Sequence, residues 1–203
     1  MKRSSFVTTA ALILGALLIA TLSSCVGFPP QITTEPSPAA PPTEVTYNIG
    51  DKGPGGGIVF YDKGQKSGGW RYLEAAPADL AGTHVWITPN AQVPGAADGI
   101  GSGKNNTALI MKVSTGNSAA KACAEYSNNG MSDWFLPSVE ELKLMFSNLH
   151  KSGLGAFSGS QYWSSTERAG TMNAIYINFG NADAQTTAFS KTSSFKVRPV
   201  RMF

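Results

Sequence analysis

The stretch "GDKGPGGGIVFYD", residues 50–62, places five glycines and a proline directly before a run of large apolar residues. It is not a phosphate-binding loop, because Gly56 and Gly57 stand where the P-loop needs a lysine and a hydroxyl residue. A dinucleotide-binding fingerprint counted from Gly53 fails because its sixth place is Ile58. Collagen needs many consecutive triplets, which are absent. The pattern therefore predicts a turn that leads into a short buried strand at 58–61.

The rest of the chain alternates short apolar runs with turn signals, which is typical of an α+β domain. Residues 77–106 are rich in Gly, Pro, Asn and Ala and predict a long irregular loop region. The predicted strands are 70–76, 84–87, 161–167, 172–179, 184–190 and 195–202. In the last of these, the apolar positions change parity at Pro199, which predicts a bulge.

Two helices are predicted, at about 119–126 and 138–149. The second opens with a capping box, in which Ser138 and Glu141 satisfy free backbone donors. Glu140 and Glu141 are adjacent on this helix, so they diverge and do not form a catalytic carboxylate pair. Cys123 falls on the apolar face of the first helix. We interpret it as an inert core thiol, the alternative being a reactive nucleophile or redox thiol.

The N-terminus has the features of a bacterial export signal. Lys2 and Arg3 precede an uncharged apolar stretch from Ala10 to Leu22, which is short for a membrane span. It ends in Leu22-Ser23-Ser24-Cys25, which resembles a lipoprotein lipobox. We therefore predict a signal peptide at 1–24 and acylation of Cys25, which anchors the protein in the lipid bilayer. An ordinary secretory signal with an incidental cysteine is the alternative. Val26 is not the aspartate of inner-membrane retention, which favours the outer membrane or cell surface.

Residues 25–45 form the predicted lipidated N-terminus and an extended tether, because half of the 12 prolines of the chain lie there. Residues 46–203 are enough for one domain. Removal of Lys2 and Arg3 leaves 14 basic residues against 13 acidic ones, so the mature chain offers no overall attraction to nucleic acid. With Cys25 acylated, Cys123 has no disulfide partner.

The motifs GPGGGIVFYD, GWRYLEAAP, DWFLPSVEEL, YWSSTE and KVRPVR occur in this order between about Tyr47 and Phe203. Together they resemble the bacterial domain of unknown function at the C-terminus of the Legionella collagen-like adhesin. That family is related to the formylglycine-generating enzyme and to C-type lectin-like folds. The resemblance implies a C-type lectin-like domain with two helices, a twisted antiparallel sheet and long irregular loops. It also implies binding to sulfated polysaccharide or host surfaces, although this chain lacks the collagen repeats.

Candidate ligand-binding residues are few. Trp134 and Trp163 can stack on a sugar, but core packing is the commoner role of such residues. A bulge at Pro199 would place Lys196, Arg198 and Arg201 on one face, where they can bind a polyanion. Internal ion pairs or a solvated face are the alternative and favoured interpretation of these three cations.

No catalytic residue, cofactor or metal site is predicted. The cysteine pair of the formylglycine-generating enzyme is missing, and His84 and His150 lie in no zinc-binding motif. The usual calcium-lectin triplets are absent, although a structural calcium site in the loops stays open. We therefore expect a lipid-anchored envelope protein, not an enzyme, whose domain binds a glycan, a glycosaminoglycan or a host or matrix protein. A structural envelope component with no soluble ligand is the alternative.

Overall fold

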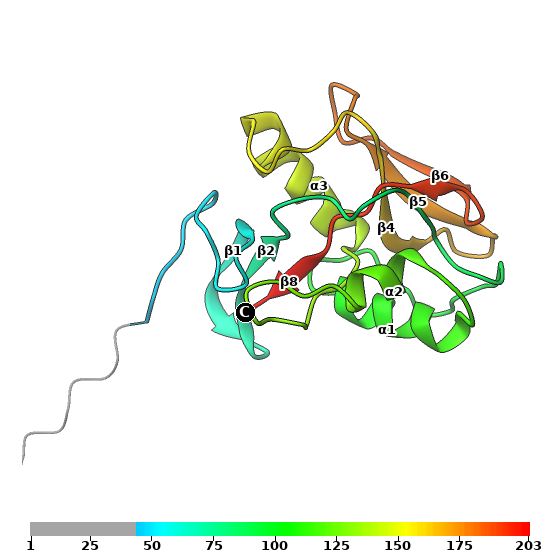
Figure 1. The fold of residues 1–203 in the computed structure, drawn as a ribbon, viewed down its shortest axis with the longest axis horizontal. Coiled ribbons are helices and arrows are strands. Elements are labelled where there is room, and N and C mark those ends of the chain that lie inside the picture. Colours follow the sequence, from blue (N-terminus) through cyan, green and yellow to red (C-terminus); the bar gives the residue numbers. More distant parts are fainter. Residues whose placement is uncertain (1–43) are drawn as a thin grey trace, which may run out of the picture. The chain divides into compact units, whose positions relative to one another are not determined.

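The computed structural model describes residues 44–203 of the chain, and the predicted signal peptide, Cys25 and most of the tether lie outside this range. The first sheet joins the two ends of the described chain (Figure 1). Strand β1 (Ile58–Ser67) pairs antiparallel with β2 (Trp70–Ala75), which pairs in turn with β8 (Val200–Met202). The carbonyl of Phe203 accepts hydrogen bonds from the amides of Arg71 and Tyr72. The strands predicted at 58–61 and 70–76 are therefore present.

The glycine-rich stretch 50–57 is the turn that the sequence predicts, and it also encloses a carboxylate. Val59 and Phe60 of the following strand are completely buried. The amides of Gly55 and Gly57 donate to Glu74 of β2 at 2.9 and 3.0 Å. A Cβ atom at Gly55 would lie 2.6 Å from a carboxylate oxygen of Glu74. The glycines are needed because the backbone approaches this buried side chain too closely for any other residue.

The C-terminal third forms two more sheets rather than one. β4 (Gln161–Glu167), β5 (Asn173–Asn178) and β6 (Thr186–Ser190) make an antiparallel sheet in that order. The strand predicted at 195–202 is wrong as a single element. It is divided into β7 (Ser194–Phe195), which pairs with β3 (His84–Val85), and β8, which pairs with β2.

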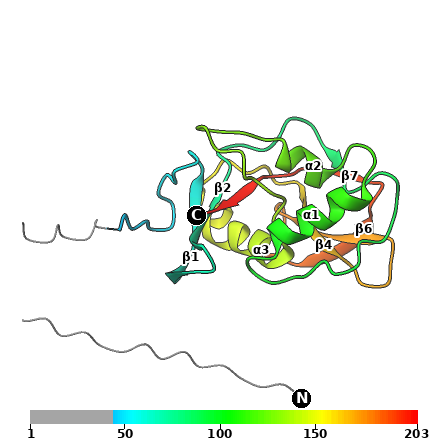
Figure 2. The ribbon, with the colours of Figure 1, turned by 90° about the horizontal axis from the view of Figure 1, so that it is seen from below.

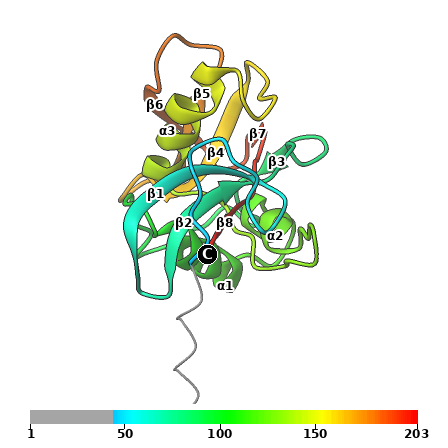
Figure 3. The same ribbon diagram turned by 90° about the vertical axis from the view of Figure 1, so that its left-hand side faces the viewer.

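The division occurs at Val197–Pro199. Pro199 has no N–H group for a ladder, and the carbonyls of Val197 and Pro199 accept from the amides of Leu80 and Ala76 in the long loop. The bulge predicted at Pro199 is therefore replaced by a break in the chain's strand pairing, with β7 before it and β8 after it. The sequence-based expectation of a single twisted sheet is replaced by three small sheets (Figure 3).

The described chain has three α-helices and a short 3₁₀ helix: α1 (Gly103–Val113), α2 (Ala119–Ala124), α3 (Val139–Asn148) and η1 (His150–Ser152). The predicted helices are α2 and α3, and the capping box of Ser138 and Glu141 is confirmed. The two-helix prediction missed α1. Its buried residues are Gly103, Asn106, Thr107 and Ile110, so only one of these four positions carries the large apolar side chain by which the buried face of a helix is recognised.

Two hydrophobic clusters fill the domain. In the first, α3 packs against both three-stranded sheets, with Phe60, Leu142 and Tyr162 at the contact. The second cluster includes Trp86, Ile110, Cys123 and Trp163, and lies where α1 and α2 meet β3 and β4 (Figure 2). The α+β class is therefore confirmed, and the C-type lectin-like architecture stays a prediction. Among residues 44–203 we find no helix with the length and apolar character needed to cross a bilayer.

Candidate functional site

The predicted cation face does not form, because Arg198 is turned into the protein. Its side chain is 1% exposed. Nε donates to Asp79 Oδ1 at 2.8 Å, and Nη1 donates to the carbonyls of Ala76 and Gly155 at 2.9 and 2.8 Å. Asp79 in turn accepts from the Tyr162 hydroxyl at 2.8 Å. This arginine joins the long loop to β4 and the segment after η1, which is a structural role.

Arg201 is also engaged inside the protein. Its Nη1 donates to Glu74 at 3.0 Å and its Nε to Asp133. Burial is the largest single influence on the pKa of Arg201 and lowers it, but the two carboxylates together outweigh burial and raise the pKa. Lys196 is only partly buried, and its backbone bonds to Gln161 and Trp163. The three residues therefore do not present a common surface to a polyanion. The internal ion pairs that the sequence favoured are what the structure contains for Arg198 and Arg201.

Both candidate tryptophans belong to the interior. Trp163 is completely buried and donates through Nε1 to the His84 carbonyl at 2.9 Å. Trp134 is 2% exposed, donates to the Met131 carbonyl at 3.1 Å and packs edge-on against Tyr126. Neither ring face is open to a sugar, so stacking by these two residues is excluded and the packing alternative holds.

Cys123 is buried and forms no disulfide. Burial raises the pKa of its thiol well above the usual value, and a neutral thiol is a poor nucleophile. The interpretation as an inert core residue agrees with this placement.

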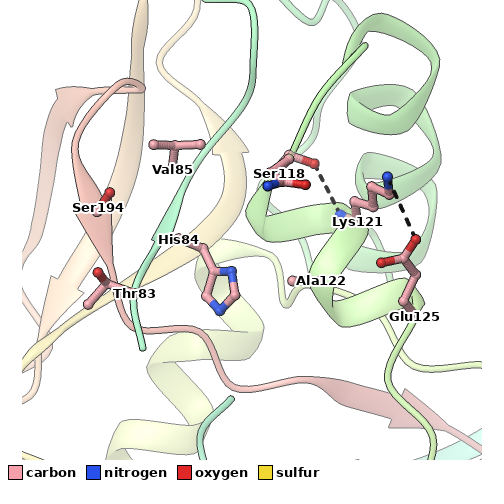
Figure 4. Close-up of a pocket in the computed structure, with 9 residues that line it drawn as sticks. Thr83, His84, Val85, Ser118, Lys121, Ala122, Glu125 and Ser194 are labelled. Atoms are coloured by element: carbon pink, nitrogen blue, oxygen red, sulfur yellow. Dashed lines mark hydrogen bonds and ion pairs between the residues drawn. The ribbon is translucent and has the colours of Figure 1, made fainter. Parts of the chain in front are cut away.

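A pocket lined mostly by polar side chains lies between the β3–β7 pair and α2 (Figure 4). The pocket has a volume of about 440 Å³. We call it the His84 pocket. Strand β3 contributes His84 and Val85, the loop before α2 contributes Asn117, and β7 contributes Ser194. Helix α2 contributes Lys121 and Ala122, and Glu125 is the residue that caps its C-terminal end. Segments far apart in the chain thus meet at one place.

His84 is the unusual member of this pocket. Its side chain projects from β3 toward α2 (Figure 4), and its Nε2 atom is buried with no hydrogen-bond partner among the described residues. Burial lowers the pKa of this imidazole, a hydrogen bond with the Ala81 backbone opposes that effect, and Lys196 nearby lowers it further. The imidazole is therefore neutral at neutral pH. An unpaired buried polar atom costs folding free energy, so a role beyond packing is worth seeking.

The charges of the pocket balance. Lys121 Nζ lies 3.8 Å from Oε1 of Glu125, four residues further along the chain, and both side chains are well exposed. Ser118 caps α2 by accepting from the Lys121 amide at 3.1 Å. Within residues 44–203 no group of three or more His, Cys, Asp or Glu side chains is placed to hold a metal ion. The pocket therefore offers neutral hydrogen-bonding groups with a balanced ion pair at its edge.

Sequence reasoning did not find this pocket. His84 is a lone histidine in a glycine-rich and proline-rich region, and its neighbours come from segments some 30 and 110 residues away. The only signal was the long loop region 77–106, since long loops often carry function.

Residues 79–201 match the Lcl C-terminal domain family. The match spans more than half of the chain and includes every residue of the His84 pocket named above, as well as Arg198 and Arg201. The protein therefore belongs to this family, as the order of its motifs predicts. No curated protein shows a significant match to the chain.

Proposed function

We propose that this member of the Lcl C-terminal domain family is a lipid-anchored adhesion protein of the cell envelope. Its domain would bind a ligand without catalysing a reaction. The observation that carries the proposal is the family match over residues 79–201, because the Lcl C-terminal domain family suggests an adhesion-type domain. Such a domain belongs at the cell surface or in the envelope.

The anchor rests on the sequence Leu22-Ser23-Ser24-Cys25 after an uncharged apolar stretch. Acylation at Cys25 would hold the mature chain on the membrane, because each buried methylene of an acyl chain contributes about 0.8 kcal/mol and two chains anchor stably. The proline-rich residues up to 45 would then keep the binding domain away from the bilayer. Val26 supports the outer membrane or the cell surface as the destination.

The absence of catalysis is part of the proposal. Within the described residues, the buried charged groups serve the framework: Arg198 binds Asp79, and Arg201 binds Glu74. Lys191 similarly pairs with Glu167 at 3.1 Å and donates to the Ala91 carbonyl at 2.6 Å, which ties the loop before α1 to the sheet. These arrangements favour a rigid scaffold that presents loops, as in the C-type lectin-like fold, over a catalytic centre.

The proposed ligand is a glycan, a glycosaminoglycan or a host or matrix protein. A direct test is binding of the full-length protein, reconstituted in liposomes, to immobilised members of these three classes, with protein-free liposomes as the control. We expect retention on at least one class. No retention on any class would contradict the adhesion proposal and favour a structural envelope component.

The anchor is tested separately by Cys25→Ser. We expect this variant to lose palmitate labelling and to leave the membrane fraction, while Cys123→Ser keeps both properties. A Cys25→Ser protein that is still labelled with palmitate would refute the lipobox assignment.

A further inference from the structure

We infer that the His84 pocket binds one uncharged sugar residue, through hydrogen bonds and without a metal ion. This inference rests on the proposed binding function and specifies the ligand chemistry of one site. It concerns a place in the fold apart from Trp134, Trp163, Arg198 and Arg201, none of which lines the pocket.

The first argument is charge. The acidic and basic side chains of the pocket lining, His84 apart, are Lys121 and Glu125, which lie 3.8 Å apart and offset one another. His84 adds no charge, because its pKa is lowered by burial and by Lys196. Among the lining residues, a sulfate or carboxylate group would therefore meet only a cation that is paired with Glu125, and a ligand cation only a carboxylate that is paired with Lys121. Lys196, whose charge acts on His84, does not line the pocket. An uncharged ligand is favoured.

The second argument is hydrogen-bonding capacity. The walls supply the hydroxyls of Thr83 and Ser194 and the amide of exposed Asn117. Hydroxyls act as both donors and acceptors, and an amide offers both functions side by side. A sugar ring likewise carries several groups that donate and accept. Among the common uncharged biological ligands, a saccharide makes the fullest use of such walls.

The third argument is the unpaired nitrogen of His84. Its Nε2 atom is buried and has no partner in the described chain, although the side chain stands at the wall of an open pocket (Figure 4). A ligand hydroxyl that reached this nitrogen after a small rotation of the ring would satisfy it. Binding would then recover free energy that the folded protein lacks without ligand.

Size and affinity agree with a single sugar residue. A volume of about 440 Å³ lies at the lower end of small-molecule pockets, which span roughly 300 to 1,000 Å³. The named lining residues include no phenylalanine, tyrosine or tryptophan, so stacking does not add to the affinity. We expect weak binding of one unit, and strong attachment only where many membrane-anchored copies meet a repeating glycan.

The test uses the full-length protein in detergent and a panel of methyl glycosides of glucose, galactose, mannose and N-acetylglucosamine, with glucuronate as the charged comparison. Ligand-observed NMR detects binding, and titration gives the affinity. His84→Phe keeps an aromatic ring but removes both ring nitrogens. Asn117→Ala removes an exposed amide of the pocket, and Asn105→Ala is its matched control because Asn105 is exposed on α1 outside the lining.

We expect at least one neutral glycoside to bind, with a loss of about five- to tenfold for His84→Phe and Asn117→Ala, the value of about one hydrogen bond. Asn105→Ala should bind as the unchanged protein does. No binding of any neutral glycoside, equal binding by all variants, or preference for glucuronate would each overturn the inference. Thermal unfolding of each variant confirms that it is folded.

The two proposals fail in different ways. If liposomes carrying the protein adhere to an immobilised ligand while no neutral glycoside binds, the adhesion function stands and the sugar assignment of the His84 pocket falls. If His84→Phe removes glycoside binding but leaves adhesion to a matrix protein intact, the pocket binds sugar and adhesion uses another surface.

Discussion

The Glu74 cluster and the His84 pocket treat buried polar groups in opposite ways. In the Glu74 cluster, which comprises Glu74, Gly55, Gly57, Arg201 and Asp133, the completely buried carboxylate accepts from two amides and one guanidinium. In the His84 pocket, a buried nitrogen has no partner in the described residues. In the first arrangement, the hydrogen bonds and the ion pair offset the cost of burying the charge. The second leaves a hydrogen-bonding group unsatisfied, and a ligand in the pocket would reach it only after the ring turns.

Removing the Glu74 carboxylate should have the largest effect on stability. Glu74→Ala leaves two glycine amides without acceptors and Arg201 with only Asp133, so we expect a loss of about 3–5 kcal/mol in the free energy of unfolding. Denaturant titration measures it. Glu140→Ala, which breaks the exposed pair with Lys143 at 2.7 Å, should cost less than about 1 kcal/mol. Equal effects of the two changes would remove the distinction between framework and surface carboxylates.

Glu141 is an intermediate case, because it is buried and hydrogen-bonded but has no cation beside it. Ser138 and Gly101 donate to it at 2.7 and 2.8 Å. Burial, the dominant cause, raises the pKa of Glu141 from 4.5 to about 7 against these hydrogen bonds.

Between these two values the folded protein binds more protons than the unfolded chain, so the contribution of Glu141 is fully present below about pH 4.5 and is lost as the pH rises through about 7. The change amounts to at most about 3 kcal/mol. Unfolding measured from pH 4.5 to 8 checks this slope. Glu141→Gln should flatten it, and an unchanged slope would assign the pH dependence to other groups.

The glycine turn offers a smaller test of the same region. In Gly55→Ala the new methyl group would lie 2.6 Å from Glu74 and 2.8 Å from Trp134, so we expect a loss of about 1–3 kcal/mol from overpacking. Gly99→Ala is the control, since its nearest neighbour, the Ser102 hydroxyl, lies at 3.7 Å. Similar melting temperatures for the two variants would show that the close approach to Glu74 is not needed.

The smallest expected effect on stability is in the His84 pocket. His84→Phe removes an unpaired buried nitrogen but also the hydrogen bond between the imidazole and the Ala81 backbone, so the two effects oppose one another and stability should stay within about 1 kcal/mol of the unchanged protein. Denaturant titration at neutral pH measures the difference. A loss as large as that of Glu74→Ala would mean that the imidazole belongs to the framework, and the contrast between the two regions would disappear.

Local features of the fold were predictable, whereas pairings between distant segments were not. The capping box of α3 could be predicted because Ser138 and Glu141 are three residues apart, and the turn before β1 because glycines and an apolar run are adjacent. Helix α1 could not, since Asn106 and Thr107 occupy its buried face. They are buried because Asn106 bonds to both the backbone of Ala97 and Ser165, and Thr107 to the backbone of Leu136.

The sequence by itself determined the α+β class, the membership of the Lcl C-terminal domain family and the local devices that begin strands and helices, because these depend on residues close together in the chain. Only the tertiary structure decided what the charged and aromatic candidates do. Arg201 meets Glu74 across 127 positions and Arg198 meets Asp79 across 119. The His84 pocket similarly needs β3, α2 and β7 to come together. No spacing in the sequence encodes such contacts, since they arise only when the sheets and helices pack around the two hydrophobic clusters.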